Sequence, residues 1–223
     1  MWRLHQHPLC PFSRKVRLAL GEKGVEFDMV KVAPWDAPDS FYSLNPAGRT
    51  PVLQHREKKI VLADSQAICE YLEEVSDERP LILGTALGRA EIRRLVALFD
   101  EQLWGDVTGP LMHEKYRKRV HLRQGPDSRV LRSAMRLLHE HMDYMDWLID
   151  NRRWLAGAQL SLADFAAAAQ LSVIDYLGGI EWSDHKGVHE WYRVMKSRPA
   201  FRGLLADKVE GLPPPRGYND PNS

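Results

Sequence analysis

The pattern of apolar residues changes once along this chain of 223 residues, and that change limits the folds it can adopt. In the first part, short strand-like runs alternate with helical segments, whereas the later residues form one amphipathic helix after another. A chain of this length can bury one large core or two modest ones. We therefore predict an α/β domain at 1–80, an all-helical domain at 88–206, and a tail at 207–223 that is rich in proline and glycine and forms no helix or strand.

Period-two alternation and turn residues indicate four short strands in the first part. A helix follows the first strand, and Asp64-Ser65 begins another, since an acid and a hydroxyl can cap free helix amides. In the second part, Ser161 and Asp164 form a capping-box pattern before a segment that is apolar on nearly every side, which indicates a buried central helix. The expected strands are 3–7, 27–32, 52–54 and 60–63.

Composition and charge exclude several classes of protein. The 31 Lys and Arg residues nearly balance the 30 Asp and Glu residues, so nothing indicates a nucleic-acid or anionic-lipid partner. The sequence shows no apolar signal segment and no uninterrupted membrane span. Cys10 and Cys69 are too few for a disulfide framework, Cys69 fits an inert core position, and no histidines pair as metal ligands at helical spacing. We expect a cytoplasmic protein without a metal, a membrane or a nucleic-acid partner.

The segment HPLCPFSRKVRLALGEKG contains a candidate reactive thiol. Cys10 precedes a helix, and the free amides and dipole of a helix N-terminus favour a thiolate. Pro11 fits a first helical turn, and Ser13 completes a Cys-x-x-Ser spacing. Arg14 and Lys15 add positive charge nearby. The same pattern also fits an inert, half-buried cysteine between a strand and a helix.

Two further segments fit a pocket for a small peptide beside this thiol. At Thr50-Pro51, a cis peptide bond would turn the backbone of Val52 toward an extended ligand. Asp64 and Ser65 at a helix N-terminus form a candidate anion site for a carboxylate. Each segment also has a plain structural interpretation, as an X-Pro turn and as an N-cap.

Taken together, the segments CPFS, NPAGRTPVL, DSQAI and LSLADFAAAA resemble the glutathione transferase family over nearly the whole chain. The resemblance implies a thioredoxin-like N-terminal domain followed by an all-helical C-terminal domain, usually in a homodimer. It also implies that Cys10 occupies the catalytic position and that Val52, beside cis-Pro51, contacts the cysteinyl part of glutathione. Asp64 and Ser65 would hold the γ-glutamyl end.

The chain resembles more closely a branch of this family that binds filaments of the division tubulin FtsZ. Four segments carry this resemblance: HPLCPFSRKVRLALGEKG, AICEYLEE, LSLADFAAAAQLSVIDYLGG and the ending KSRPAFRGLLADKVEGLPPPRGYND. This resemblance implies a retained fold whose function has changed from catalysis to filament binding, at the division site. The alternative is a glutathione-dependent thiol transferase or reductase that uses Cys10.

Four residues are candidate contacts for such a protein partner. Trp35 lies in a proline-flanked loop, which is a common place for an interface anchor. Tyr218 and Asp220 lie in a prolyl-stiffened tail that could dock on a partner, and Glu114 lies in a charged helix. The alternatives are a ring that folds back onto its own domain, a frayed terminus and a solvated helix face.

Overall fold

The computed structural model describes residues 1–76 and 78–221 and has the predicted fold class, with a strand-rich part followed by a helical part. Four strands form one mixed sheet in the order β2-β1-β3-β4, in which β1 pairs parallel with β2 and antiparallel with β3. Each strand lies within one residue of its expected bounds. The strands are β1 (Trp2–Gln6), β2 (Phe27–Lys31), β3 (Val52–His55) and β4 (Ile60–Ala63).

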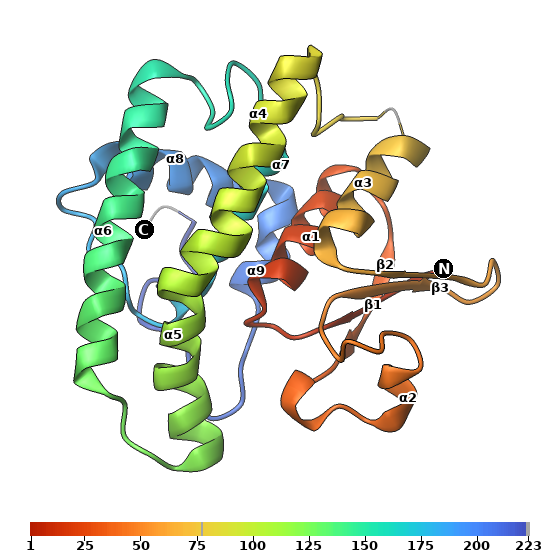
Figure 1. Ribbon diagram of the computed structural model, residues 1–223, viewed down its shortest axis with the longest axis horizontal. Coiled ribbons are helices and arrows are strands. Elements are labelled where there is room, and N and C mark those ends of the chain that lie inside the picture. The colour runs from red at the N-terminus through yellow and green to blue at the C-terminus, as the bar shows by residue number, and fades with distance from the viewer. Residues whose placement is uncertain (77, 222–223) are drawn as a thin grey trace.

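Three helices accompany the sheet, and Figure 1 shows two of them on one face and the short third one on the other. Those on the first face are α1 (Pro11–Glu22) and α3 (Ser65–Val75), and the short one is α2 (Asp39–Tyr42). The turn η1 (Pro34–Asp36) lies between β2 and α2. This arrangement is the thioredoxin-like one that the sequence resemblance implies.

The helical part begins with one long helical run and ends in short turns. The run consists of α4 (Ala86–Ala97), η2 (Leu98–Thr108), α5 (Gly109–Leu111) and η3 (Met112–Leu122), and η2 and η3 are π-helical. The remaining elements are α6 (Ser128–Asn151), α7 (Leu162–Tyr176), α8 (Lys186–Ser197), η4 (Pro199–Phe201) and α9 (Arg202–Leu205). Among the described residues, no helix combines the length and the apolar character that a membrane span requires.

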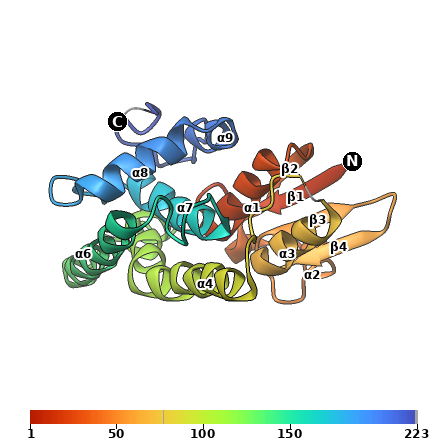
Figure 2. The same ribbon diagram turned by 90° about the horizontal axis from the view of Figure 1, so that it is seen from above.

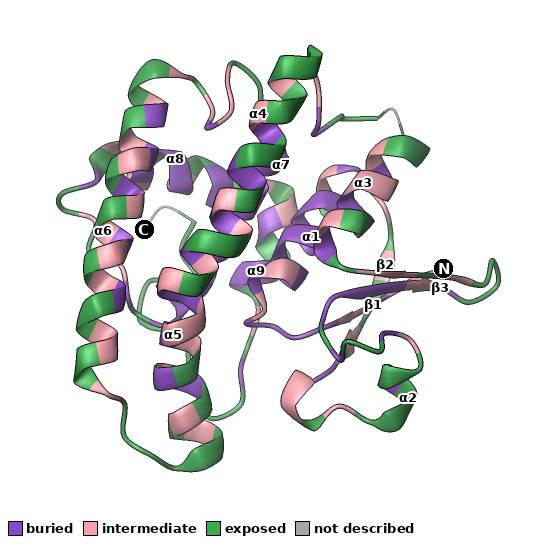
Figure 3. Cartoon of the chain, in the orientation of Figure 1, coloured by how far each residue is buried: buried purple, intermediate pink, exposed green. Residues whose placement is uncertain are grey.

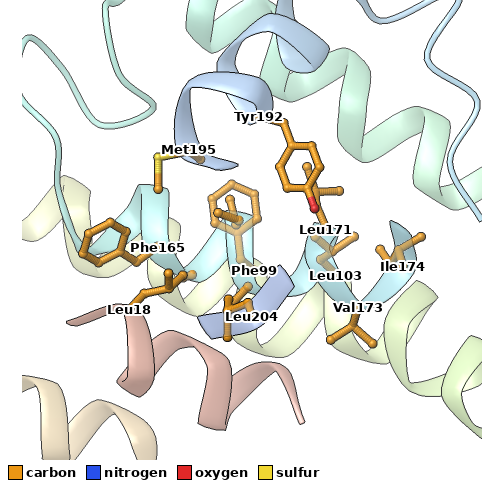
Figure 4. Close-up of a cluster of buried hydrophobic side chains, with 14 of the residues drawn as sticks. Leu18, Phe99, Leu103, Phe165, Leu171, Val173, Ile174, Tyr192, Met195 and Leu204 are labelled. Atoms are coloured by element: carbon orange, nitrogen blue, oxygen red, sulfur yellow. The ribbon is translucent and has the colours of Figure 1, made fainter. Parts of the chain in front are cut away.

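Helix α7 is the central helix, and it lies against α1 where the two halves meet (Figure 2). Leu18 of α1, Phe165 of α7 and Leu204 of α9 belong to one continuous cluster of buried side chains (Figure 4). Because this core crosses from the sheet to the helices, the two halves stabilise each other.

Helix α1 is buried on its charged side as well as on its apolar side. Every residue from Ser13 to Leu20 is buried, including the three cations, and Figure 3 shows the helix buried over most of its surface. Arg14 and Arg17 pair with Asp207, and Lys15 pairs with Asp100. Lysine and arginine side chains usually face solvent, but acids from the helical half pair with these three cations.

The tail after α9 folds back onto the protein. Val209 and Leu212 form an isolated bridge, and the Tyr176 hydroxyl donates to the carbonyl of Leu212 (2.9 Å). The amide of Val209 donates to the same hydroxyl (3.0 Å). Within 207–221 the tail contains no helix or strand, and residues 222 and 223 of the expected tail lie outside the described residues.

The capping box of α7 contains the buried carboxylate of Asp164, which accepts hydrogen bonds from four donors. Asp164 is fully buried and accepts from the amides of Leu155 (3.0 Å) and Ser161 (2.9 Å). It also accepts from the Ser161 hydroxyl (3.0 Å) and from the indole nitrogen of Trp191 (3.1 Å). The carboxylate thus joins the start of α7 to the α6–α7 connection and to α8.

We expect Asp164→Ala to lower the free energy of unfolding by about 3 to 5 kcal/mol, because it leaves several buried donors without an acceptor. Denaturation by urea, followed by circular dichroism, measures the change. Asp150→Ala on the exposed face of α6 is the control and should have little effect. A loss of less than about 1 kcal/mol for Asp164→Ala contradicts the prediction.

Candidate functional site

Cys10 lies at the junction between β1 and α1, where it is the N-cap residue of the helix. Its thiol is half-buried and donates a hydrogen bond to the carbonyl of Thr50 (Sγ to O, 3.5 Å). Its amide donates to the carbonyl of His7 (2.9 Å). The side chain makes no capping bond to the amides of α1, so the thiol faces the Thr50 loop rather than the helix axis.

The peptide bond between Thr50 and Pro51 is cis, as expected. The carbonyl that faces the thiol belongs to Thr50, the residue before the proline, and sequence reasoning did not select Thr50. The proline itself was the available signal, because a cis bond redirects the residue on either side of it. Val52 is buried in β3 between β1 and β4, and its predicted contact with a ligand stays a prediction.

The two cations that were expected to act on Cys10 have other partners. The Arg14 guanidinium contacts Asp207, Ser172 and Tyr218 in the helical half, and the ammonium of Lys15 contacts Asp100. A charge that is held this closely by a carboxylate acts mainly on that carboxylate. The positive charges of Arg14 and Lys15 are therefore paired with acids of the helical half.

Asp64 has an unusual backbone conformation, with φ at 77° and ψ at 133°. A positive φ is uncommon outside glycine, and such strain is concentrated at functional sites. One carboxylate oxygen of Asp64 accepts from the amides of Gln66 (2.7 Å) and Ala67 (3.3 Å). The plain N-cap interpretation is therefore correct, and Asp64 itself occupies amides that would bind a ligand's carboxylate. The predicted anion site of Asp64 and Ser65 stays a prediction.

Trp35 packs across the boundary between the two halves of the protein. Its half-buried ring lies 4.9 Å from the rings of His7 and His121 and 5.8 Å from that of Tyr116, measured between centroids. We call these four residues the aromatic cluster. Trp35 thus contacts helix η3 in the helical half. The ring therefore does not pack against its own domain alone, which was the alternative to an interface anchor.

His7 connects the aromatic cluster to Cys10, and sequence reasoning did not select it. Its Nδ1 accepts from the amide of Leu9 (3.2 Å), so in the neutral ring Nε2 carries the hydrogen and faces the hydroxyl of Tyr116 (3.4 Å). Burial, reinforced by the positive charges of Lys31 and Arg14, lowers the pKa of His7 from 6.5 to about 3. The imidazole is therefore neutral near pH 7 and holds the residues before Cys10 in place.

Two of the four candidate partner contacts are buried, which corrects the sequence interpretation. Glu114 accepts from Lys118 (2.7 Å) and from the amide of Asp127 (2.7 Å), and these bonds outweigh burial and keep the pKa of Glu114 below its usual value. Tyr218 is only 2% exposed. Neither side chain is available to a partner, whereas Asp220 is exposed and Trp35 is half-exposed.

Comparison with known proteins identifies the family. The model of the glutathione S-transferase N-terminal domain matches residues 9–75. FtsZ-localized protein A of Caulobacter vibrioides (strain NA1000 / CB15N) is 47% identical to this chain over 220 residues, which cover 97% of this chain and 96% of the relative. The chain belongs to the glutathione S-transferase family. The Cys10 loop and the cis-proline turn both lie in the matched N-terminal segment.

Two solved structures of the family superpose on the whole chain. A glutathione S-transferase from Rhodospirillum rubrum F11 has a TM-score of 0.97 at 47% identity and matches over all of both chains. FzlA from C. crescentus has a TM-score of 0.96 at 45% identity and matches over all of this chain and 99% of its own. Because relatives with different names are about equally similar, family membership alone does not separate catalysis from association with FtsZ.

The neutral state of His7 predicts how stability depends on pH. The unfolded chain binds a proton at His7 below about pH 6.5, whereas the folded protein does so only near pH 3. The folded state therefore loses stability as the pH falls through this window, at up to about 1.4 kcal/mol per pH unit. Between pH 7 and pH 4.5, His7 should account for about 2 to 3 kcal/mol of the lost unfolding free energy.

His7→Asn keeps an acceptor for the Leu9 amide and removes the titrating ring. Its unfolding free energy should fall less than that of the wild type over this range. The control His113→Asn, at an exposed histidine, should lose as much unfolding free energy as the wild type. Chemical denaturation at the two pH values measures both. Equal losses in His7→Asn and in the wild type contradict the prediction.

Proposed function

We propose that this protein associates with FtsZ filaments in the cytoplasm, at the division site, and regulates cell division without catalysis. One observation carries the proposal, the 47% identity to FtsZ-localized protein A over 97% of this chain. The match to the FzlA structure extends over the whole chain. A likeness of this extent favours a shared function more strongly than a shared domain does.

The surroundings of Cys10 also favour binding over catalysis. The aromatic cluster lies beside the loop that carries the thiol, and its rings contact residues from both halves of the protein. The thiol donates a hydrogen bond to the carbonyl of Thr50, and the carboxylate of Asp64 accepts from two amides at the start of α3. A peptide ligand that needed the Cys10 thiol or these amides would have to displace these internal contacts.

We further propose that the protein acts as a homodimer, as is usual in this family. A dimer would present two identical binding surfaces, so it would crosslink or bend a filament through avidity without any additional contact. Trp35 and Asp220 remain the candidate contacts, because both have surface that a partner can reach.

Co-sedimentation with polymerised FtsZ tests the proposal. The wild type should pellet with the filaments, and Cys10→Ser should pellet equally well, since the thiol is not needed. Asp220→Lys should bind about tenfold more weakly, because it reverses a charge at the contact. Asp184→Lys, at another exposed acid, is the matched control and should bind normally. Pelleting of the wild type that does not exceed that of an unrelated protein contradicts the proposal.

A glutathione-dependent thiol transferase is the second candidate, and a specific observation favours it. The hydroxyls of Ser13 and Thr50, close to Cys10 in the fold, are buried and have no hydrogen-bond partner among the described residues. A ligand bound beside the thiol would supply such partners. In this reaction the Cys10 thiolate would attack a glutathione mixed disulfide, take the glutathionyl group and release the other thiol. A reduced glutathione would then attack the glutathionyl sulfur on Cys10, forming oxidised glutathione and releasing the Cys10 thiolate.

Calorimetric titration with reduced glutathione separates the two candidates. The transferase predicts binding at or below millimolar concentration, and turnover of a mixed disulfide that Cys10→Ser abolishes and Cys69→Ser preserves. Cys69 is a suitable control because it is only 2% exposed and burial raises the pKa of its thiol to about 12. Absence of binding and of turnover removes this candidate.

A further inference from the structure

Arg14 is a buried cation that contacts both the Cys10 loop and the C-terminal tail. It lies in the first turn of α1, and its side chain is fully buried. Its Nε donates to the carbonyl of Pro8 (2.6 Å), and its Nη1 donates to the hydroxyl of Tyr218 (3.0 Å). The two acceptors are far apart in the sequence and share one planar guanidinium.

On the side of the loop, Arg14 is attached at two points. The side chain binds the Pro8 carbonyl, and the backbone amide donates to the carbonyl of Cys10 (3.0 Å). Between these two acceptors, Leu9 is held by Nδ1 of His7. A displacement of the guanidinium therefore acts directly on the residues that carry the thiol.

On the side of the tail, Tyr218 is one of the residues that hold Arg14, and Ser172 of α7 also accepts from Nη1 of Arg14 (2.9 Å). The Tyr218 hydroxyl accepts from Arg14 and donates to the carbonyl of Leu204 (3.1 Å). Its ring packs edge-on against Tyr176, with 5.0 Å between the centroids. Asp207, at the start of the tail, lies 3.5 Å from Nη2 of Arg14.

A buried guanidinium cannot lose an acceptor without a cost. Removal of one partner from a buried, hydrogen-bonded charge leaves that charge undersatisfied, so the side chain moves to recover a partner. The guanidinium of Arg14 is rigid and planar. A movement of this group after the release of Tyr218 therefore also changes its hydrogen bond to the carbonyl of Pro8.

We propose that Arg14 couples the C-terminal tail to the Cys10 loop. When the tail is docked, Arg14 holds the loop and keeps the thiol against Thr50; when the tail is released, the loop loosens and Cys10 becomes more accessible. Because coupling between two sites is reciprocal, a bulky group on Cys10 also favours release of the tail. A partner that draws the tail away from the body would thereby expose the thiol. The inference is independent of which function the protein has.

The rate at which a disulfide reagent modifies Cys10 in the native, full-length protein tests the coupling. Tyr218→Phe removes the tail's hydroxyl from Arg14, leaves the Ser172 hydroxyl in place, and should increase this rate at least threefold. Tyr42→Phe, at a tyrosine that is 44% exposed, should leave it unchanged. Cys69 monitors unfolding within the same molecule, and it should stay unmodified in each variant.

The reverse direction is measured by trypsin. Cleavage after Lys208 and Arg216 should be faster when Cys10 carries a bulky maleimide than in the unmodified protein. Deletion of 217–223 removes Tyr218 altogether and is the decisive variant, since it should increase the rate at Cys10 even if Tyr218→Phe leaves the tail docked. An unchanged Cys10 rate in this deletion variant overturns the proposal.

Discussion

The position of α1 between the sheet and the helical half depends on three buried cations. Arg14 and Arg17 pair with Asp207, and Lys15 pairs with Asp100, so acids from outside the sheet half neutralise every cation on this helix. Loss of one partner from a buried ion pair is strongly destabilising, because it leaves an uncompensated charge. The pairs therefore fix how the helical half is placed on the sheet half. Since Cys10 is the N-cap of α1, they also fix where the thiol lies.

At the thiol site some polar groups are engaged within the protein, whereas the hydroxyls of Ser13 and Thr50 are buried without a partner among the described residues. Cys10 lies against Thr50, the residue before cis-Pro51. The Cys10 thiol donates to the backbone at Thr50, and the amides of Gln66 and Ala67 in α3 donate to the carboxylate of Asp64. Beside the site, a neutral His7 and the ring of Trp35 connect the loop to η3. Folds of this kind host both catalysts and binding proteins, and what decides between them is whether a ligand can displace these internal contacts.

Much of the fold could be predicted from local patterns, whereas the environment of single side chains could not. The strands were placed within one residue, since their alternation and turn residues are local signals. The Ser161–Asp164 capping box was also correct for a local reason, because both partners lie within one turn. Glu114 and Tyr218 were assigned to the surface because their neighbours in the sequence are polar. Their burial depends on partners from other elements, such as Asp127 and Arg14, which no local pattern reveals.

By itself, the sequence determined the order of strands and helices, the central helix with its cap, the cis-proline turn and the placement of Cys10 before α1, because each depends on residues that are close together in the chain. Only the tertiary structure decided which charges act on the thiol, which rings lie beside it and where the tail goes. These properties depend on contacts between distant residues, such as the 204 positions that separate Arg14 from Tyr218. The partner of a buried charge is the group that tertiary packing places next to it, and local sequence patterns do not predict which group that is.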